Sequence, residues 1–120
     1  MSIDIVCYTS ISIDELRERL GMVRTKYNHL FDGSYLMFDP HTILSRQQLE
    51  LIDDRIEKYN QETKLLIAEE FGLNEPRSYF LIAVNNKYFP ELNTSQIADV
   101  FRKELGERNI IVLLNGEDLI

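Results

Sequence analysis

The sequence predicts an α/β domain, or an α+β domain if one strand runs antiparallel at an edge, with the element order β-α-β-α-β-α-β. Residues 79–84 and 110–114 are continuous apolar runs, which are typical of strands covered on both faces. Residues 94–105 between them have apolar side chains at helical spacing, and a strand–helix–strand unit of this kind favours a parallel crossover. We therefore expect about four strands, at least the last two of them parallel, packed with three helices.

Each expected helix begins with a capping side chain that is followed, three residues later, by Glu or Gln. The pairs are Ser12 with Glu15, Ser45 with Gln48, and Asn93 with Gln96. In this arrangement the cap oxygen accepts from a free backbone N–H of the first turn, and the Glu or Gln side chain accepts from the N–H of the cap. These pairs predict where the three helices start.

The first strand is expected over residues 3–8, and the first helix follows from about Ile13. Residues 35–38 are a short apolar run between turn signals and predict the second strand. Asp32 and Gly33 have the turn chemistry to end the first helix. The inward stripe of that helix is expected to be Leu16, Leu20, Val23, Tyr27 and Leu30.

The second helix is expected from Arg46 to about residue 71, where Gly72 is a stop signal. Its length of about 39 Å, at 1.5 Å per residue, exceeds what a small domain needs. We expect either a break near residues 60–61 or an end that projects toward a partner. The expected inward stripe is Leu49, Ile52, Ile56, Tyr59, Thr63 and Leu66. The face opposite this stripe is expected to point outward and to be mildly acidic. It contains Glu50, Asp54, Glu57 and Gln61, with Asp53 at its border.

Length and composition predict a single globular domain over residues 1–120. The 44% hydrophobic and 28% charged content is that of an ordinary globular protein. Cys7 is the one cysteine, so no internal disulfide forms, which suits a reducing cytoplasm. No secretory signal and no membrane-spanning run is visible, and we expect a cytoplasmic protein.

The net charge of −7 indicates which kinds of molecule the chain can bind. An acidic surface repels phosphate backbones and anionic lipid headgroups, so we expect no direct nucleic-acid or membrane binding. The same surface attracts a basic protein.

The pattern for an enzyme is missing. Ser10 lacks the glycines of a nucleophile elbow, Cys7 has no second cysteine nearby, and His29 and His41 are far apart in the sequence. There is no glycine-rich phosphate loop of a standard spacing. We therefore expect no enzymatic activity, no cofactor and no metal site.

A small-ligand site at the carboxyl ends of the strands is the alternative function. In a mostly parallel sheet those ends meet at one edge, where polar loops converge on a ligand. The candidate residues are Thr9, Ser10, Asp39, His41, Asn85, Asn86 and Lys87. On this alternative the chain is a small-ligand-binding or regulatory domain.

The favoured function is protein binding. The small, acidic, single-domain profile without catalytic motifs is similar to that of bacterial immunity proteins and antitoxins that neutralise a basic nuclease. That resemblance implies that carboxylates on the second helix take the place of substrate phosphates and occlude the active site of a toxin. Tyr88 and Phe89, beside Pro90, are either an interface anchor or a lid on the sheet. Strand order and oligomeric state are not specified by the sequence.

Overall fold

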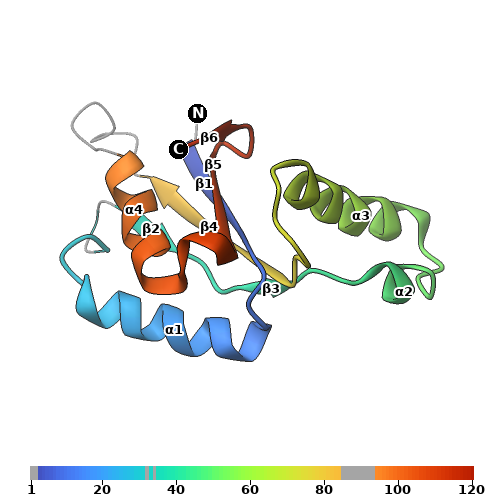
Figure 1. Ribbon diagram of the computed structural model, residues 1–120, viewed down its shortest axis with the longest axis horizontal. Helices are drawn as coiled ribbons and strands as arrows, with labels where there is room; N and C mark the ends of the chain where they lie inside the picture. The colour runs from blue at the N-terminus through green and yellow to red at the C-terminus, as the bar shows by residue number, and fades with distance from the viewer. Residues whose placement is uncertain (1–2, 32, 34, 85–93) are drawn as a thin grey trace.

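The chain forms one sheet with helices on both faces (Figure 1). The computed structural model describes residues 3–31, 33, 35–84 and 94–120. The first half of the chain contains β1 (Ile3–Thr9), α1 (Ile13–Lys26), β2 (Tyr35–Met37), β3 (His41–Thr42) and α2 (Arg46–Leu49). The second half contains α3 (Arg55–Glu70), β4 (Ser78–Val84), α4 (Thr94–Leu105), a 3₁₀ turn (Glu107–Asn109), β5 (Ile110–Leu114) and β6 (Asp118–Leu119).

The strand order is β2-β4-β1-β5-β6, with β3 also paired to β4, and all these pairs are antiparallel. The α/β prediction with a parallel final pair is therefore wrong, and the domain is α+β. The strands β4 and β5 are not neighbours, because β1 lies between them: Ile5 faces Ile82 on one side and Leu114 on the other. Both strands are antiparallel to β1, so β4 and β5 run in the same direction without being hydrogen-bonded to each other, and their apolar pattern is the same as that of two paired parallel strands. The expected strand number was too low because β3 and β6 have two residues each.

The two faces of the sheet carry different helices. On one face, α1 and α4 cover the larger core, where Phe80, Phe101 and Ile5 are fully buried. On the other face, α2 and α3 pack on Tyr8 and Leu113. Strand β5 is buried on both faces as predicted, whereas β4 alternates between buried and half-buried side chains, so its predicted double coverage is wrong. The helices α2 and α3 thus cover only part of their face.

The first and third expected helices are confirmed. Helix α1 begins at Ile13, buries Leu16, Leu20 and Val23, and ends at Lys26, earlier than the turn signals predicted. Helix α4 spans residues 94–105.

The three predicted capping pairs have different outcomes. Ser45 and Gln48 form the predicted reciprocal bonds, at 3.3 and 2.9 Å, whereas the Ser12 side chain makes no capping bond. Asn93 lies outside the described residues.

The second expected helix is two helices. Helix α2 ends at Leu49, and α3 begins at Arg55. The break is at residues 50–54 and not near residues 60–61. The Asp54 carboxylate accepts from the backbone N–H groups of Ile56 and Glu57, at 2.9 and 3.2 Å, and so caps α3. Asp54 and Glu57 have the spacing of the other capping pairs, and this signal marked the break in the sequence.

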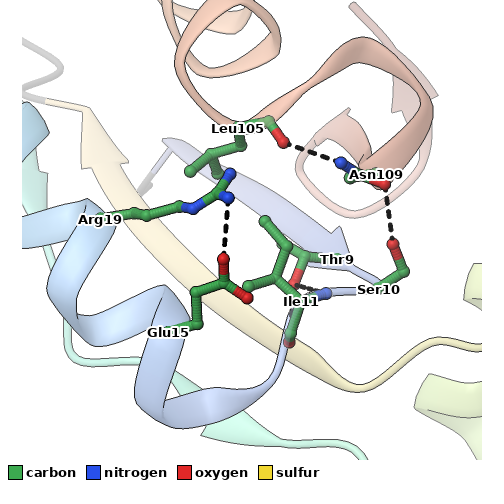
Figure 2. A network of polar contacts seen from close by, with 7 residues as sticks. All are labelled: Thr9, Ser10, Ile11, Glu15, Arg19, Leu105 and Asn109. Atoms are coloured by element: carbon green, nitrogen blue, oxygen red, sulfur yellow. Dashed lines mark hydrogen bonds and ion pairs between the residues drawn. The ribbon is translucent and has the colours of Figure 1, made fainter.

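The turn between α4 and β5 is fastened to the end of β1 by Asn109 (Figure 2). The Asn109 amide donates to the Leu105 carbonyl at 3.1 Å, and its Oδ1 accepts from the Ser10 hydroxyl at 3.3 Å. Nearby, Glu15 and Arg19 form an ion pair within α1, at 2.8 Å. Asn109 therefore satisfies a carbonyl at the end of α4 and fixes where β5 enters the sheet.

Candidate partner-binding surface

The strand ends predicted as a ligand site do not meet at one edge. Thr9, the last residue of β1, faces Ser78, the first residue of β4, whereas Val84, the last residue of β4, faces Ile3. Because β1 and β4 are antiparallel, the loops that follow them leave the sheet at opposite ends. The predicted convergence is wrong for this reason. Asn85, Asn86 and Lys87 lie outside the described residues.

The hydroxyl of Thr9 is used inside the domain. Thr9 and Ser78 are both buried, and their hydroxyls are hydrogen-bonded to each other. Ser78 also donates to the Ile11 carbonyl at 2.7 Å, and the Ile11 N–H donates to Thr9 Oγ1 at 3.2 Å. This cluster holds the turn between β1 and α1 to the start of β4, which is a structural role.

The other predicted ligand residues that the structure describes lie near the same end of the sheet as Thr9, since β3 and the end of β1 both pair with the start of β4. Ser10 is engaged with Asn109, and Asp39 is exposed. The His41 ring stacks on Tyr79, with 5.4 Å between ring centroids. A hollow of about 360 Å³ lies nearby, between the start of α1 and the start of α2, but none of Thr9, Ser10, Asp39 and His41 lines it. Ligand binding by any one of them stays a prediction.

Two further sequence predictions concern catalysis. Cys7 is fully buried, and burial raises the pKa of its thiol far above the ordinary value, so the thiol stays protonated and packs as a small apolar group. Among the described residues, no three His, Cys, Asp or Glu side chains gather in a way that suits a metal ion.

The most prominent surface is made by residues 46–70, which we call the α2–α3 arm. It lies at one end of the molecule's long axis, which measures 43 Å, and on the opposite side of the sheet from α1 and α4 (Figure 1). Helix α3 buries Leu65 and Ala68 in its second half, and no residue from 55 to 64 is buried. The first half of α3 therefore stands clear of the core.

An ion pair joins the two helices of the arm. Arg46 of α2 donates through both terminal nitrogens to the carboxylate of Glu69 on α3, and the Nη1–Oε2 distance is 3.0 Å. The neighbouring Glu69 carboxylate raises the pKa of Arg46 above its ordinary value. Between the helices lies a groove of about 260 Å³, lined by Arg46, Leu49, Glu50, Lys58, Glu62, Leu65 and Leu66.

Helix α3 faces the opposite way from the prediction. Of the expected inward stripe, Leu49 is buried and Ile52 packs on the core. After the break the same stripe points outward: Ile56, Tyr59 and Leu66 are 76%, 69% and 50% exposed. The inward contact is made by Leu65 and Ala68, which lie on the other side of the helix, and Thr63 is half-buried. Leu51, in the break, is 82% exposed.

The residues of the predicted acidic face have different environments, because α3 faces the opposite way from the prediction. Glu50, Asp53 and Glu57 are exposed, whereas the exposed Asp54 carboxylate is engaged as the α3 cap. Gln61 is half-buried, and its Oε1 is buried without a hydrogen-bond partner among the described residues. Tyr88 and Phe89 lie outside the described residues, and their role as an interface anchor or as a lid on the sheet stays a prediction.

Sequence reasoning missed the exposed apolar residues of the arm as candidates for function. They are Leu51, Ile56, Tyr59 and Leu66. The spacing of the stripe continues in phase across the break, so periodicity alone assigned all of it to the core. The capping pair of Asp54 and Glu57 was the one signal that separated the two halves.

The described part of the chain combines an antiparallel α+β fold with a projecting arm that is both apolar and acidic. Exposed apolar side chains beside acidic ones are typical of the surface of a protein-binding domain. The chain belongs to the family described as CDI System Immunity Component, whose model matches residues 1–118. Membership of this family confirms the prediction of a non-enzymatic protein of the immunity type.

Solved structures support the fold. A chain of the CdiA-CT/CdiI toxin and immunity complex from Burkholderia pseudomallei is similar, with a TM-score of 0.70 and 22% sequence identity. The similarity covers 98% of this chain and 95% of that chain. No curated protein sequence matches. Among the described helices, none has the length and apolar content to cross a bilayer.

Proposed function

We propose that this protein binds a toxin and neutralises it. The observation that carries the proposal is the match of nearly the whole chain to a family of immunity components. The similar chain from Burkholderia pseudomallei comes from a complex of a toxin with its immunity protein. By analogy, the partner of this chain is a toxin domain, and the site of action is the cytoplasm.

The charge of the chain supports a basic, nuclease-like toxin as the partner. The net charge is −7, and residues 46–70 contain seven acidic and four basic side chains. Exposed carboxylates speed the approach of a basic partner and select against acidic ones. On this proposal, Glu50, Asp53 and Glu57 occupy positions that the substrate's phosphates would take, and the arm occludes the toxin's active site.

A co-expression experiment tests neutralisation. The first step is to identify, in the source genome, a toxin domain encoded immediately upstream of this chain. That domain is the probe, and it is produced in a host that lacks the chain. We expect arrested growth with the toxin domain alone and normal growth when this chain is co-expressed. A toxin domain from an unrelated system, which should stay toxic, is the control. Continued arrest in the presence of abundant, folded chain would contradict the proposal.

Association kinetics test the role of the acidic residues. Combining Glu50→Lys, Asp53→Lys and Glu57→Lys should slow association by about tenfold at low salt and flatten its salt dependence, because these charges attract the toxin. Asp54 is left intact because its loss would uncap α3. The matched control combines Glu18→Lys, Glu107→Lys and Glu117→Lys, which are exposed elsewhere and change the net charge equally. Equal slowing by both variants would show that no particular face is used.

A further inference from the structure

The outer face of α3 is apolar, and nothing in the described residues covers it. Ile56 and Tyr59 are three residues apart, and Leu66 lies two turns beyond Tyr59 with the half-buried Thr63 between them. All three apolar side chains lie on the side of α3 opposite to the buried Leu65 and Ala68. A surface helix usually turns its apolar stripe to the core. Here the helix has two apolar sides, and one of them faces outward.

This orientation has a cost in the free protein. The amide oxygen of Gln61 is buried without a hydrogen-bond partner among the described residues, and three large apolar side chains remain in water. Contiguous exposed apolar side chains bordered by polar ones mark sites of protein association. A partner that covers Ile56, Tyr59 and Leu66 removes these side chains from water, whereas Gln61 lies on the inward side of α3, one turn before Leu65, and stays as it is.

The surroundings of the stripe indicate the chemistry of that partner. Glu62 and Glu70 each lie one helical turn from Leu66 and are exposed, and Glu50 and Asp53 are exposed in and beside the break. Arg55 and Lys58 offset part of this charge. An apolar centre with a mainly acidic rim fits a partner surface that has an apolar hollow bordered by Lys and Arg.

We propose that Ile56, Tyr59 and Leu66 form the centre of the toxin-binding surface and carry most of the binding energy, whereas the acidic residues of the arm set the association rate. This inference rests on the proposed function, because its occupant is the toxin domain. Tyrosine is enriched among the residues that dominate interface energies, and Tyr59 is central in the stripe. The α2–α3 groove adjoins the stripe, since Leu66 borders both.

Single truncations test this assignment. The full chain and the variants Ile56→Ala, Tyr59→Ala and Leu66→Ala are titrated with the toxin domain encoded upstream. We expect Tyr59→Ala to weaken binding by about 30-fold or more, mainly through faster dissociation. Met22→Ala is the matched control, because Met22 is 67% exposed on α1. It should leave affinity within about twofold.

Folding and oligomeric state are measured on the same samples. The truncated side chains are exposed, so the melting temperatures should stay close to that of the wild type. If the wild type binds the toxin domain and all three variants bind it with the same affinity, this inference is overturned and the proposed function stands. Absence of wild-type binding would remove both. A wild-type dimer that Tyr59→Ala converts to a monomer would assign the face to a second copy of the chain, and that also overturns the inference.

Discussion

At the residue scale, the turn between α4 and β5 depends on Gly106 and Asn109 together. Gly106 has φ of 94°, in the left-handed region that residues with a Cβ rarely adopt. A Cβ at this position would lie 2.7 Å from Nδ2 of Asn109. That nitrogen donates to the Leu105 carbonyl, so a larger residue would also break the bond that closes α4.

Replacing Gly106 should therefore destabilise the fold. We expect Gly106→Ala to lower the free energy of unfolding by about 1–3 kcal/mol. The control is Gly21→Ala, because Gly21 lies within α1 with open space around its Cα, and this change should stabilise by about 0.5–1 kcal/mol. Urea unfolding of both variants measures the difference, and an unchanged midpoint for Gly106→Ala would contradict the account of this turn.

A second residue-scale feature is the contact between α1 and α4 at Glu104. Its carboxylate accepts from Lys26 Nζ at 2.9 Å and from the Tyr27 hydroxyl at 2.7 Å. These hydrogen bonds, with Lys26 the larger cause, lower the pKa of Glu104, and the bond to Glu104 raises the pKa of Tyr27. The contact therefore makes stability depend on pH.

The sign of this dependence follows from the lowered pKa of Glu104. The contribution is present above the unfolded-state pKa, about 4.3, and is lost as pH falls through the lower pKa of the folded state. We expect the difference in free energy of unfolding between wild type and Glu104→Gln to be largest above about pH 5 and to shrink toward pH 3. A difference that is constant between pH 7 and pH 3 would exclude this role for the Glu104 carboxylate.

At the element scale, Asp54 determines where α3 begins within the α2–α3 arm. Its carboxylate caps α3, so α2 ends and a new helix begins. This helix turns a different side toward the core, with Leu65 and Ala68 buried. This explains what sequence reasoning missed. The apolar spacing from Leu49 to Leu66 is continuous, and only the cap distinguishes one long helix from two. Helices α1 and α4 were correctly predicted as single helices because one apolar stripe runs along each of them and packs on the core.

Loss of this cap has a measurable cost. We expect Asp54→Ala to lower the free energy of unfolding by about 1 kcal/mol, because two backbone N–H groups of α3 lose their acceptor. Asp53→Ala is the matched control, because Asp53 is an exposed aspartate next to Asp54, which is the cap. The change in free energy of unfolding for Asp53→Ala should stay within about 0.5 kcal/mol. Equal losses in the two variants would mean that the cap does not stabilise α3.

At the scale of the whole molecule, the sequence indicated the class of function better than the topology. Charge and composition do not depend on strand order, so the prediction of an acidic binding protein did not depend on the incorrect sheet topology. The predicted topology was wrong because the apolar runs at 79–84 and 110–114 do not record that β1 lies between them. The predicted convergence of all the strand-end loops was wrong for the same reason, since β1 and β4 are antiparallel, whereas ligand binding by the individual residues stays a prediction.

Hydrogen–deuterium exchange of the free chain and of its complex with the upstream-encoded toxin domain tests the central claim, binding through the α2–α3 arm. Exchange depends on local opening, and a bound partner suppresses that opening where it sits. We expect slower exchange over residues 46–70 in the complex, with little change in α1. Slower exchange confined to α1 or to the ends of the strands, with residues 46–70 unchanged, would contradict it.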